Sequence, residues 1–367
     1  APGIVVASPS QSDPDYYFHW VRDAALVTNA LIQIGYQIPA LKNRVEMHLN
    51  DFVEATVKQQ TSKALTGLGE PKFFVDGSPF DGPWGRPQND GPALRAITLI
   101  NWANLLIDQG EIVKVRTLLY DSRLPTQSPI KRDLEYVSQN WREPSFDIWE
   151  EVKGDHFYTR YVQMSALVKG EGLARRLGDS RAADWYRAQA EEVQDSLDSF
   201  FDLKKGTLRT TLNQVDGLNY KSSELDVAVV LGILHGDLWD ATHFTPKIRS
   251  AIDKTIEELK ESFNEIYPIN YSKNKKAVIL GRYPEDRYFG GHPWFLTTFA
   301  IAEYYRKTKQ NLVEADGLMA EGLYHAGANC QMDEQIHRES GYMLSAYDLT
   351  WSYAAFLTAH WSEPQIK

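Results

Sequence analysis

Helical periodicity dominates this chain and constrains its fold more than any other feature. Apolar residues recur at three- and four-residue spacing along most of the sequence, whereas the alternation typical of β-strands is scarce. This pattern predicts eleven helices, with ends placed to within a few residues. The predicted helices cover residues 21–37, 41–60, 92–109, 129–141, 156–177, 181–201, 222–234, 246–265, 293–307, 311–327 and 345–360.

Loops rich in acidic and aromatic residues precede every second predicted helix, while the other connections are shorter or plainer. If alternate helices run parallel in an inner ring, these loops all gather at one end of that ring. The sequence therefore predicts an all-α fold, an (α/α)6 barrel of helical hairpins with a pocket at its mouth. The loops contain residues 15–23, 81–90, 149–151, 222–226, 281–286 and 332–335.

The helix count leaves one question about this barrel. Six hairpins need twelve helices, and the pattern yields eleven and starts on an inner helix. Either an outer helix before residue 1 is missing or the weak segment 111–119 disturbs the count. No Pro/Gly/Ser-rich linker and no change of composition divides the chain, so we expect residues 1–367 to form a single domain.

The composition argues against several kinds of binding partner, namely nucleic acids, membranes and metal ions. The net charge of −10 and the lack of a dense basic stripe argue against nucleic acid, and no apolar run reaches the roughly 20 residues that span a bilayer. The single cysteine, Cys330, excludes an intrachain disulfide and is expected to be a small buried hydrophobe. No metal-binding pattern is present, so we expect no metal or organic cofactor. The sequon Asn270-Tyr271-Ser272 weakly favours a secretory route.

Two glutamates are the best candidates for acid–base chemistry. Glu150 follows Ile148-Trp149, and this apolar shoulder is expected to desolvate its carboxyl group and raise its pKa, as a general acid requires. The adjacent Glu151 points in a different direction, so a facing carboxylate must come from elsewhere. Glu334 is the best candidate. Taken alone, either residue is far more often a solvated surface carboxylate, and only the context favours a catalytic pair.

Other residues in these loops suit a ligand with hydroxyl groups and flat apolar faces. Trp20, Arg22 and Asp23 offer donors, an acceptor and a ring at a helix start, although the residues alone favour a salt-bridge cluster as the explanation of the charged pair. Arg282 with Asp286 allows the same two interpretations. Trp84 lies in a rigid Gly- and Pro-containing loop, where it either presents a fixed indole or anchors the loop.

Several longer motifs resemble one enzyme family. The chain is similar to the fungal glucoamylases, inverting exo-acting glucan 1,4-α-glucosidases, over nearly its whole length. The matching segments are Gly3–Ser10, Trp20–Asp23, Trp84–Arg95, Phe146–Glu151, Gly281–Asp286 and Asp348–Tyr353.

The resemblance implies roles for individual residues. It assigns Glu150 as the catalytic acid and Glu334 as the catalytic base, with Glu339 as the fallback base. Arg22, Asp23 and Arg282 match residues that grip the terminal glucose, and Trp84 matches a tryptophan over the scissile region. The other pocket-lining positions are Tyr16, Trp20, Trp149, Glu151, Trp294 and Trp351.

The implied activity is release of glucose from non-reducing ends of α-1,4-glucans, and more slowly from α-1,6 bonds, with inversion. Inversion requires carboxyl groups about 6.5–9.5 Å apart, and like charge on Asp147 and Glu151 is expected to keep Glu150 protonated. A non-catalytic glucan-binding relative and a trehalase- or dextran-type hydrolase are the alternatives. The family's leading helix and starch-binding module have no counterpart in the sequence, and we expect a monomer that is secreted or vacuolar.

Overall fold

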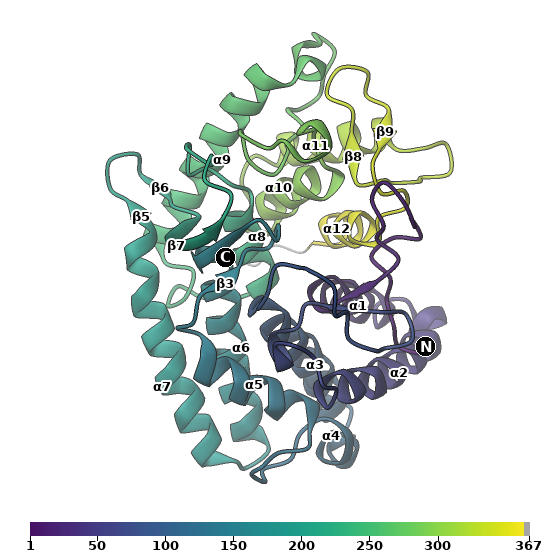
Figure 1. Ribbon diagram of the computed structural model, residues 1–367, viewed down its shortest axis with the longest axis vertical. Coiled ribbons are helices and arrows are strands. Elements are labelled where there is room, and N and C mark those ends of the chain that lie inside the picture. Colours follow the sequence, from purple (N-terminus) through teal and green to yellow (C-terminus); the bar gives the residue numbers. More distant parts are fainter. Residues whose placement is uncertain (363–367) are drawn as a thin grey trace. The chain divides into compact units, whose positions relative to one another are not determined.

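The computed structural model describes residues 1–362, which divide into two compact units, each described here by itself (Figure 1). The first unit comprises Ala1–Val6, Phe18–Asp198 and Asn213–Gly217. The second unit comprises Ala7–Tyr17, Ser199–Leu212 and the chain from Leu218 onward.

Helices build most of the first unit. Three of them, α1, α3 and α6, lie side by side, and α2, α5 and α7 pack against this row (Figure 1). The short helix α4 packs on α3. Their bounds are α1 Val21–Gly35, α2 Lys42–Gln60, α3 Asp90–Asp108, α4 Ile112–Leu118, α5 Pro129–Asn140, α6 Phe157–Arg176 and α7 Ser180–Ser196.

The second unit repeats this arrangement. The helix α10 packs against both α8 and α12, while α9 packs on α8, and α11 packs on α10 and α12. The bounds are α8 Ala228–Gly236, α9 Pro246–Ile266, α10 Phe295–Thr308, α11 Leu312–His325 and α12 Thr350–His360. Residues 1–362 thus contain twelve α-helices.

Burial separates the two kinds of helix. In α3, α6, α8 and α10 most residues are buried on all sides, whereas α9 buries a stripe that runs from Ile248 through Ile252 and Leu259 to Phe263. A helix that is apolar all round belongs inside a fold, and one with a single apolar stripe belongs on its outside. The helices α3, α6, α8 and α10 are four of the six that the sequence places after the acid- and aromatic-rich loops, whereas α12, another of the six, buries only four of its 11 residues.

All eleven predicted helices are present. The largest differences lie at the starts of α8 and α12, which begin six and five residues later than predicted at 222 and 345, and at the end of α7, which stops five residues before the predicted 201. The weak segment 111–119 forms α4, the twelfth helix, and buries only Val115 among its seven residues.

Strands are short and serve mainly to shape the loops. The antiparallel pairs are β1 with β2, β5 with β6 and β8 with β9, and β4 lies between β3 and β7 in a three-stranded sheet. Residues 213–217 of β7 belong to the first unit. The bounds are β1 His19–Trp20, β2 Lys72–Phe73, β3 Ser145–Phe146, β4 Val152–His156, β5 Phe201–Asp202, β6 Thr207–Leu208, β7 Thr211–Gly217, β8 Gln335–Ile336 and β9 Met343–Leu344.

Candidate functional site

Glu150 closes the tight loop between β3 and β4. Its backbone N–H donates to the carbonyl of Asp147 at 2.9 Å, and its φ of 65° lies in the left-handed region. The Asp147 carboxylate accepts the backbone N–H groups of Glu151 at 2.7 Å and Val152 at 3.0 Å. Asp147 therefore shapes the turn. A non-glycine residue in this backbone conformation is uncommon, and here the surrounding hydrogen bonds of the turn hold it.

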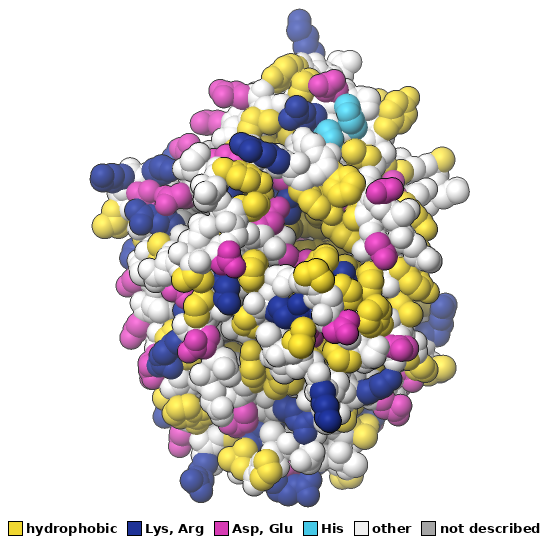
Figure 2. Space-filling model, viewed as in Figure 1, with side chains coloured by type: hydrophobic (Ala, Val, Ile, Leu, Met, Phe, Trp, Pro, Cys, Tyr) yellow, Lys and Arg dark blue, Asp and Glu magenta, His cyan; other side chains and the backbone are white. Residues whose placement is uncertain are grey.

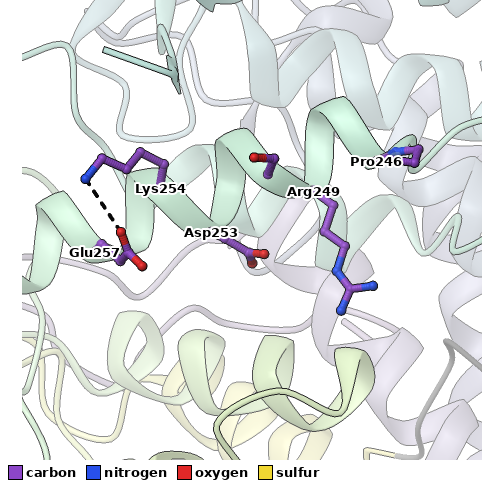
Figure 3. A pocket seen from close by; sticks show the side chains of 6 residues that line it. Pro246, Arg249, Asp253, Lys254 and Glu257 are labelled. Carbon is purple, nitrogen blue, oxygen red and sulfur yellow. Dashed lines mark ion pairs between the residues drawn. The ribbon is translucent and has the colours of Figure 1, made fainter.

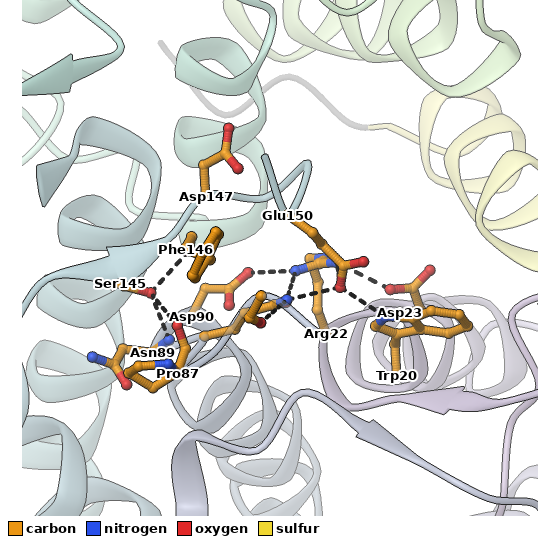
Figure 4. A network of polar contacts seen from close by, with 12 residues as sticks. Trp20, Arg22, Asp23, Pro87, Asn89, Asp90, Ser145, Phe146, Asp147 and Glu150 are labelled. Carbon is orange, nitrogen blue, oxygen red and sulfur yellow. Dashed lines mark hydrogen bonds and ion pairs between the residues drawn. The ribbon is translucent and has the colours of Figure 1, made fainter. Parts of the chain in front are cut away.

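Four donors surround the Glu150 carboxylate in the first unit, and Figure 4 labels two of them, Trp20 and Arg22. Trp20 Nε1 and Gln88 Nε2 donate to Oε1 at 2.7 and 2.8 Å, and Arg22 Nη2 lies 3.4 Å from the same oxygen. Trp84 Nε1 donates to Oε2 at 2.9 Å. The predicted apolar surrounding is therefore wrong for the carboxyl oxygens. Ile148 and Trp149 are buried, but the groups that contact the oxygens are N–H donors, which stabilise negative charge.

Arg22 is the centre of a buried charge cluster at the start of α1. Its Nη1 donates to Gln88 at 2.9 Å and to Asp90 at 3.1 Å, and its Nε lies 3.5 Å from Asp23. Burial raises the pKa of Asp23 to about 6, an effect that the neighbouring Arg22 cation only partly offsets. The salt-bridge interpretation of this segment is thus confirmed. The additional role of Arg22 and Asp23 in gripping a sugar stays a prediction.

The loop that carries Trp84 is fixed by Arg86. The Arg86 guanidinium binds Glu70 at 3.0 Å and donates to the carbonyls of Phe80 at 2.9 Å and Gly82 at 2.8 Å. A Cβ on Gly85 would lie 2.9 Å from the ring of Phe146 and 3.2 Å from the carbonyl oxygen of Glu150. Glycine is needed here because the Trp84 loop packs directly on the Glu150 loop.

Glu334 lies in the second unit, directly before β8, and is fully buried. Because Gln335 pairs with Leu344, the next residues outward are Glu334 and Ser345, and the Ser345 hydroxyl donates to Oε2. Gln335 Nε2 donates to the same oxygen at 3.3 Å. Oε1 has no hydrogen-bond partner within residues 1–362. Burial raises the pKa of Glu334 to about 7.

Three of the predicted residues neighbour Glu334. Tyr16 hydrogen bonds Glu334 and lies 2.7 Å from the Tyr288 hydroxyl. Arg282 forms a bidentate pair with Asp286 at 2.7 and 2.6 Å, and its charge also acts on Glu334. The backbone of Trp294 bridges to Gln335, next to Glu334, and the Trp294 ring lies 5.2 Å from the Arg282 guanidinium. The loops before α10 and α12 therefore meet at Glu334.

Four of the predicted residues differ in burial and position: Trp149, Glu151, Trp351 and Glu339. Trp149 is buried in the Glu150 turn, and Glu151 follows it. Trp351 is buried at the start of α12, with its ring 5.9 Å from that of His235. Glu339, the fallback base, is exposed, whereas Glu334 is fully buried. This difference favours Glu334 over Glu339 as the candidate base.

Sequence reasoning missed Gln88, Ser345 and Lys72 near the two carboxylates. Gln88 lies inside a matched motif and links Arg22 to Glu150, so its position offered a signal. Ser345 lies opposite Glu334 across a hairpin that the sequence did not predict. Lys72 is nearly fully buried among aromatic rings, which no local pattern indicates.

Two expectations about single residues are wrong. Cys330 is exposed, with a φ of 59°, because it lies in the turn after α11 and not on a helix face. Asn270 is buried, and its side-chain amide bonds to the backbone of Phe263 at 3.1 Å and of Ile279 at 3.0 and 3.1 Å. The sequon therefore has a structural explanation and no longer supports a secretory route.

Other surface features lie apart from these residues. A depression along α9 in the second unit is lined by Pro246, Arg249, Ser250, Asp253, Lys254 and Glu257 (Figure 3). It includes none of the predicted site residues. On the face shown in Figure 2, positive and negative side chains are interspersed.

Two features of residues 1–362 bear on metal ions and membranes as partners. Within residues 1–362, no three His, Cys, Asp or Glu side chains are grouped so that they could hold a metal ion. None of the helices in this range combines the length and the hydropathy needed to cross a bilayer.

Two glutamates, Glu150 and Glu334, lie in loops before helices of an all-α chain, and most glycoside hydrolases work with a pair of Asp or Glu side chains. Comparison with known proteins identifies the family. The family described as "Glycosyl hydrolases family 15" matches residues 1–316, and the chain belongs to it.

The curated relatives described below are all named as glucoamylases. The chain is 34% identical to the glucoamylase of Blastobotrys adeninivorans, over 100% of this chain and 68% of that protein. It is 33% identical to a probable glucoamylase of Schizosaccharomyces pombe, over 100% of this chain and 86% of that protein. A more distant relative, 28% identical, is the intracellular sporulation-specific glucoamylase of Saccharomyces cerevisiae. The predicted class of enzyme, a glucan 1,4-α-glucosidase with fungal relatives, is confirmed.

Solved structures confirm the predicted fold class. The glucoamylase of Hypocrea jecorina matches 98% of this chain with a TM-score of 0.84 at 33% identity, and this chain spans 66% of it. The glucoamylase of Hormoconis resinae matches 100% of this chain with a TM-score of 0.85 at 31% identity, and this chain spans 70% of it. The fold is all-α, of the (α/α)6-barrel class.

Proposed function

We propose that this chain is an exo-acting, inverting hydrolase that releases glucose from the non-reducing ends of α-1,4-glucans. Starch, glycogen and maltooligosaccharides are the proposed substrates, and α-1,6 bonds are cleaved more slowly. Glu150 protonates the glycosidic oxygen, and Glu334 removes a proton from the attacking water. Family membership and the names of the relatives support the substrate class.

The environment of Glu334 is the observation that carries the assignment of roles. A base ends its step as a neutral carboxylic acid. Full burial stabilises that neutral form, as the pKa near 7 indicates. Ser345 and Gln335 hold Oε2, which leaves Oε1 as the oxygen that accepts the proton.

The environment of Glu150 suits the opposite role. A general acid ends its step as a carboxylate, and the N–H groups of Trp20, Trp84 and Gln88 with the Arg22 cation stabilise that negative charge. Three of the four donors bind Oε1, whereas Oε2 receives Trp84 alone among the contacts described above. Oε2 is therefore the oxygen that holds and delivers the proton.

The other matched residues bind the substrate in this proposal. Charged groups bond the hydroxyls of the terminal glucose, and aromatic rings contact the apolar sugar faces. The reaction needs no metal or organic cofactor, because both proton transfers are made by carboxyl groups. The proposed binding residues are Arg22, Asp23, Arg282, Tyr16, Trp20, Trp84, Trp149, Glu151, Trp294 and Trp351.

We further propose that residues 1–367 act as one catalytic domain and as a monomer, secreted or held in a compartment of the secretory pathway. Size-exclusion chromatography with light scattering tests the oligomeric state. Fractionation of producing cells and medium tests the compartment.

A substrate that needs no general acid separates the two roles. Fluoride leaves α-D-glucosyl fluoride without protonation, so Glu150→Gln should lose about a thousandfold in kcat on maltose yet keep most of its rate on the fluoride. Glu334→Gln should lose activity on both substrates, because water activation is needed in each. The exposed Glu339→Gln is the matched control and should retain wild-type rates on both. Near-normal maltose hydrolysis by Glu150→Gln or by Glu334→Gln would refute the assignment.

Stereochemistry and specificity test the rest of the proposal. Proton NMR of the first glucose released from an α-linked substrate should show the β-anomer, and the α-anomer would mean retention. Glucose release should be faster from maltose and starch than from isomaltose, and trehalose should not be cleaved. Activity on trehalose alone would favour the trehalase-type alternative, and no activity on any substrate would favour the non-catalytic one.

A further inference from the structure

Lys72 lies in a cage of four aromatic rings in the first unit. Its ammonium group is 3.9 Å from the ring centre of Phe18, 4.6 Å from Trp20, 4.4 Å from Phe80 and 3.6 Å from Trp84. The residue is only 3% exposed. A lysine is seldom buried this deeply, because removing an ammonium group from water is costly unless other groups compensate.

The fold places Lys72 in this cage by strand pairing. Trp20 of β1 lies directly opposite Lys72 of β2, so the two side chains share one side of the pair. The Lys72 carbonyl accepts the N–H of Phe80 at 3.0 Å, which brings the start of the Trp84 loop over the ammonium group. The rings also contact one another, with Trp20 and Trp84 centres 5.9 Å apart.

Two of the four rings also bind Glu150. Trp20 donates its indole N–H to Oε1 at 2.7 Å and Trp84 donates to Oε2 at 2.9 Å, so the two indoles hold both oxygens of one carboxyl group. A cation on the face of an indole is attracted by the electron-rich ring. The same attraction fixes the ring plane and makes the N–H a stronger donor. Lys72 therefore acts on Glu150 indirectly, through the Trp20 and Trp84 rings that lie between them.

We propose that Lys72 is a positioning residue for the general acid, acting through Trp20 and Trp84. It holds the indole N–H groups on the Glu150 carboxyl group, and its charge stabilises the carboxylate left after proton donation. This inference rests on the proposed role of Glu150 as the acid.

The test compares a substrate that needs the acid with one that does not. Lys72→Met keeps the length of the side chain and removes the charge. Its kcat on maltose should fall about tenfold, since a desolvated cation–π interaction of about 1.4 kcal/mol corresponds to that factor. Its kcat on α-D-glucosyl fluoride should stay within about twofold, because fluoride departs without protonation. Lys72→Arg, which keeps the charge and can stack on the rings, should recover most of the maltose rate.

A pH profile gives a second readout that a purely structural role would not move. Other charged groups also lie near Glu150: Arg22 pairs with Glu150 directly, and Asp23 and Asp90 pair with Arg22. Removing the Lys72 cation leaves the Glu150 carboxylate less stabilised, so the alkaline limb of kcat on maltose should move to higher pH. Lys114→Met is the matched control, since Lys114 lies 5.1 Å over the Trp102 ring away from Glu150, and its rates should be unchanged.

Two milder substitutions keep the test decisive if Lys72→Met does not fold. Phe18→Leu removes one wall of the cage and should reduce the maltose rate about threefold while sparing the fluoride rate. In a Trp84→Phe background, Phe18→Leu should change the maltose rate less than it does in the wild type, since coupled residues are not additive. An unchanged maltose rate in the folded variants, or equal losses on both substrates, would overturn the inference. Active Glu150→Gln would instead overturn the proposed function on which it rests.

Discussion

Replacing Glu334 by glutamine should stabilise the protein at alkaline pH while it abolishes activity. The folded-state pKa of about 7 lies above the ordinary value of 4.5 because the carboxyl group is fully buried. The folded state therefore binds the proton more tightly than the unfolded chain. The stability that comes from the neutral carboxyl is complete below pH 4.5 and is lost as the pH rises through about 7. At 1.36 kcal/mol per pH unit, this gap corresponds to about 3 kcal/mol of unfolding free energy.

Guanidinium chloride denaturation at several pH values measures this effect. Glutamine cannot ionise, so Glu334→Gln and wild type should differ little at pH 4.5, and the variant should be more stable by about 3 kcal/mol at pH 8. Glu339→Gln provides the control, because its side chain is exposed and its curve should follow wild type. A stability difference that does not change with pH would refute the argument that burial holds the Glu334 proton.

Three further predictions concern contacts of Glu334, of the Glu151 backbone and of the buried Asn270. Ser345→Ala removes a hydrogen bond that lowers the pKa of Glu334, so the acidic limb of kcat/KM should move up by about one pH unit, while Ser340→Ala should leave it in place. Gly217→Ala would place a Cβ 2.1 Å from the Glu151 carbonyl oxygen at a φ of +91°, so melting temperature and kcat should both fall. Asn270→Ala breaks three buried hydrogen bonds and should cost about 3 kcal/mol of unfolding free energy, and mass spectrometry of protein from a glycosylating host should find no glycan at Asn270.

Helices were the part of the fold that local periodicity could predict. An apolar stripe such as that of α9 is visible within any short window of sequence, and its bounds differ from the prediction by one residue. The prediction failed where side chains oppose the pattern. Residues 222–227 stay outside α8 because Ser222 and Ser223 bind Glu285, and the Asp226 carboxylate accepts the Ala228 N–H at 2.8 Å.

Burial of single residues was much harder to predict. The sequon at Asn270 is a three-residue pattern that carries no information about packing, and its asparagine is 2% exposed. Lys72 is another case of the same kind, since a lysine is usually found at the surface and this one is 3% exposed. Both outcomes depend on partners elsewhere in the chain: Phe263 and Ile279 for Asn270, and the rings of Phe18 and Trp84 for Lys72.

The roles of the two glutamates show why a sequence can nominate catalytic residues without explaining them. The motifs single out Glu150 and Glu334, but the groups that set their chemistry lie far away in the chain. Glu150 is bound by Trp20, 130 positions earlier, and by Gln88, 62 positions earlier. Under the proposed roles, each environment favours the state in which its residue would end the reaction: N–H donors surround the Glu150 carboxyl group, and burial of Glu334 favours a neutral acid. The proposed acid and the proposed base are the same amino acid, so any difference in their chemistry must come from what the fold places around them.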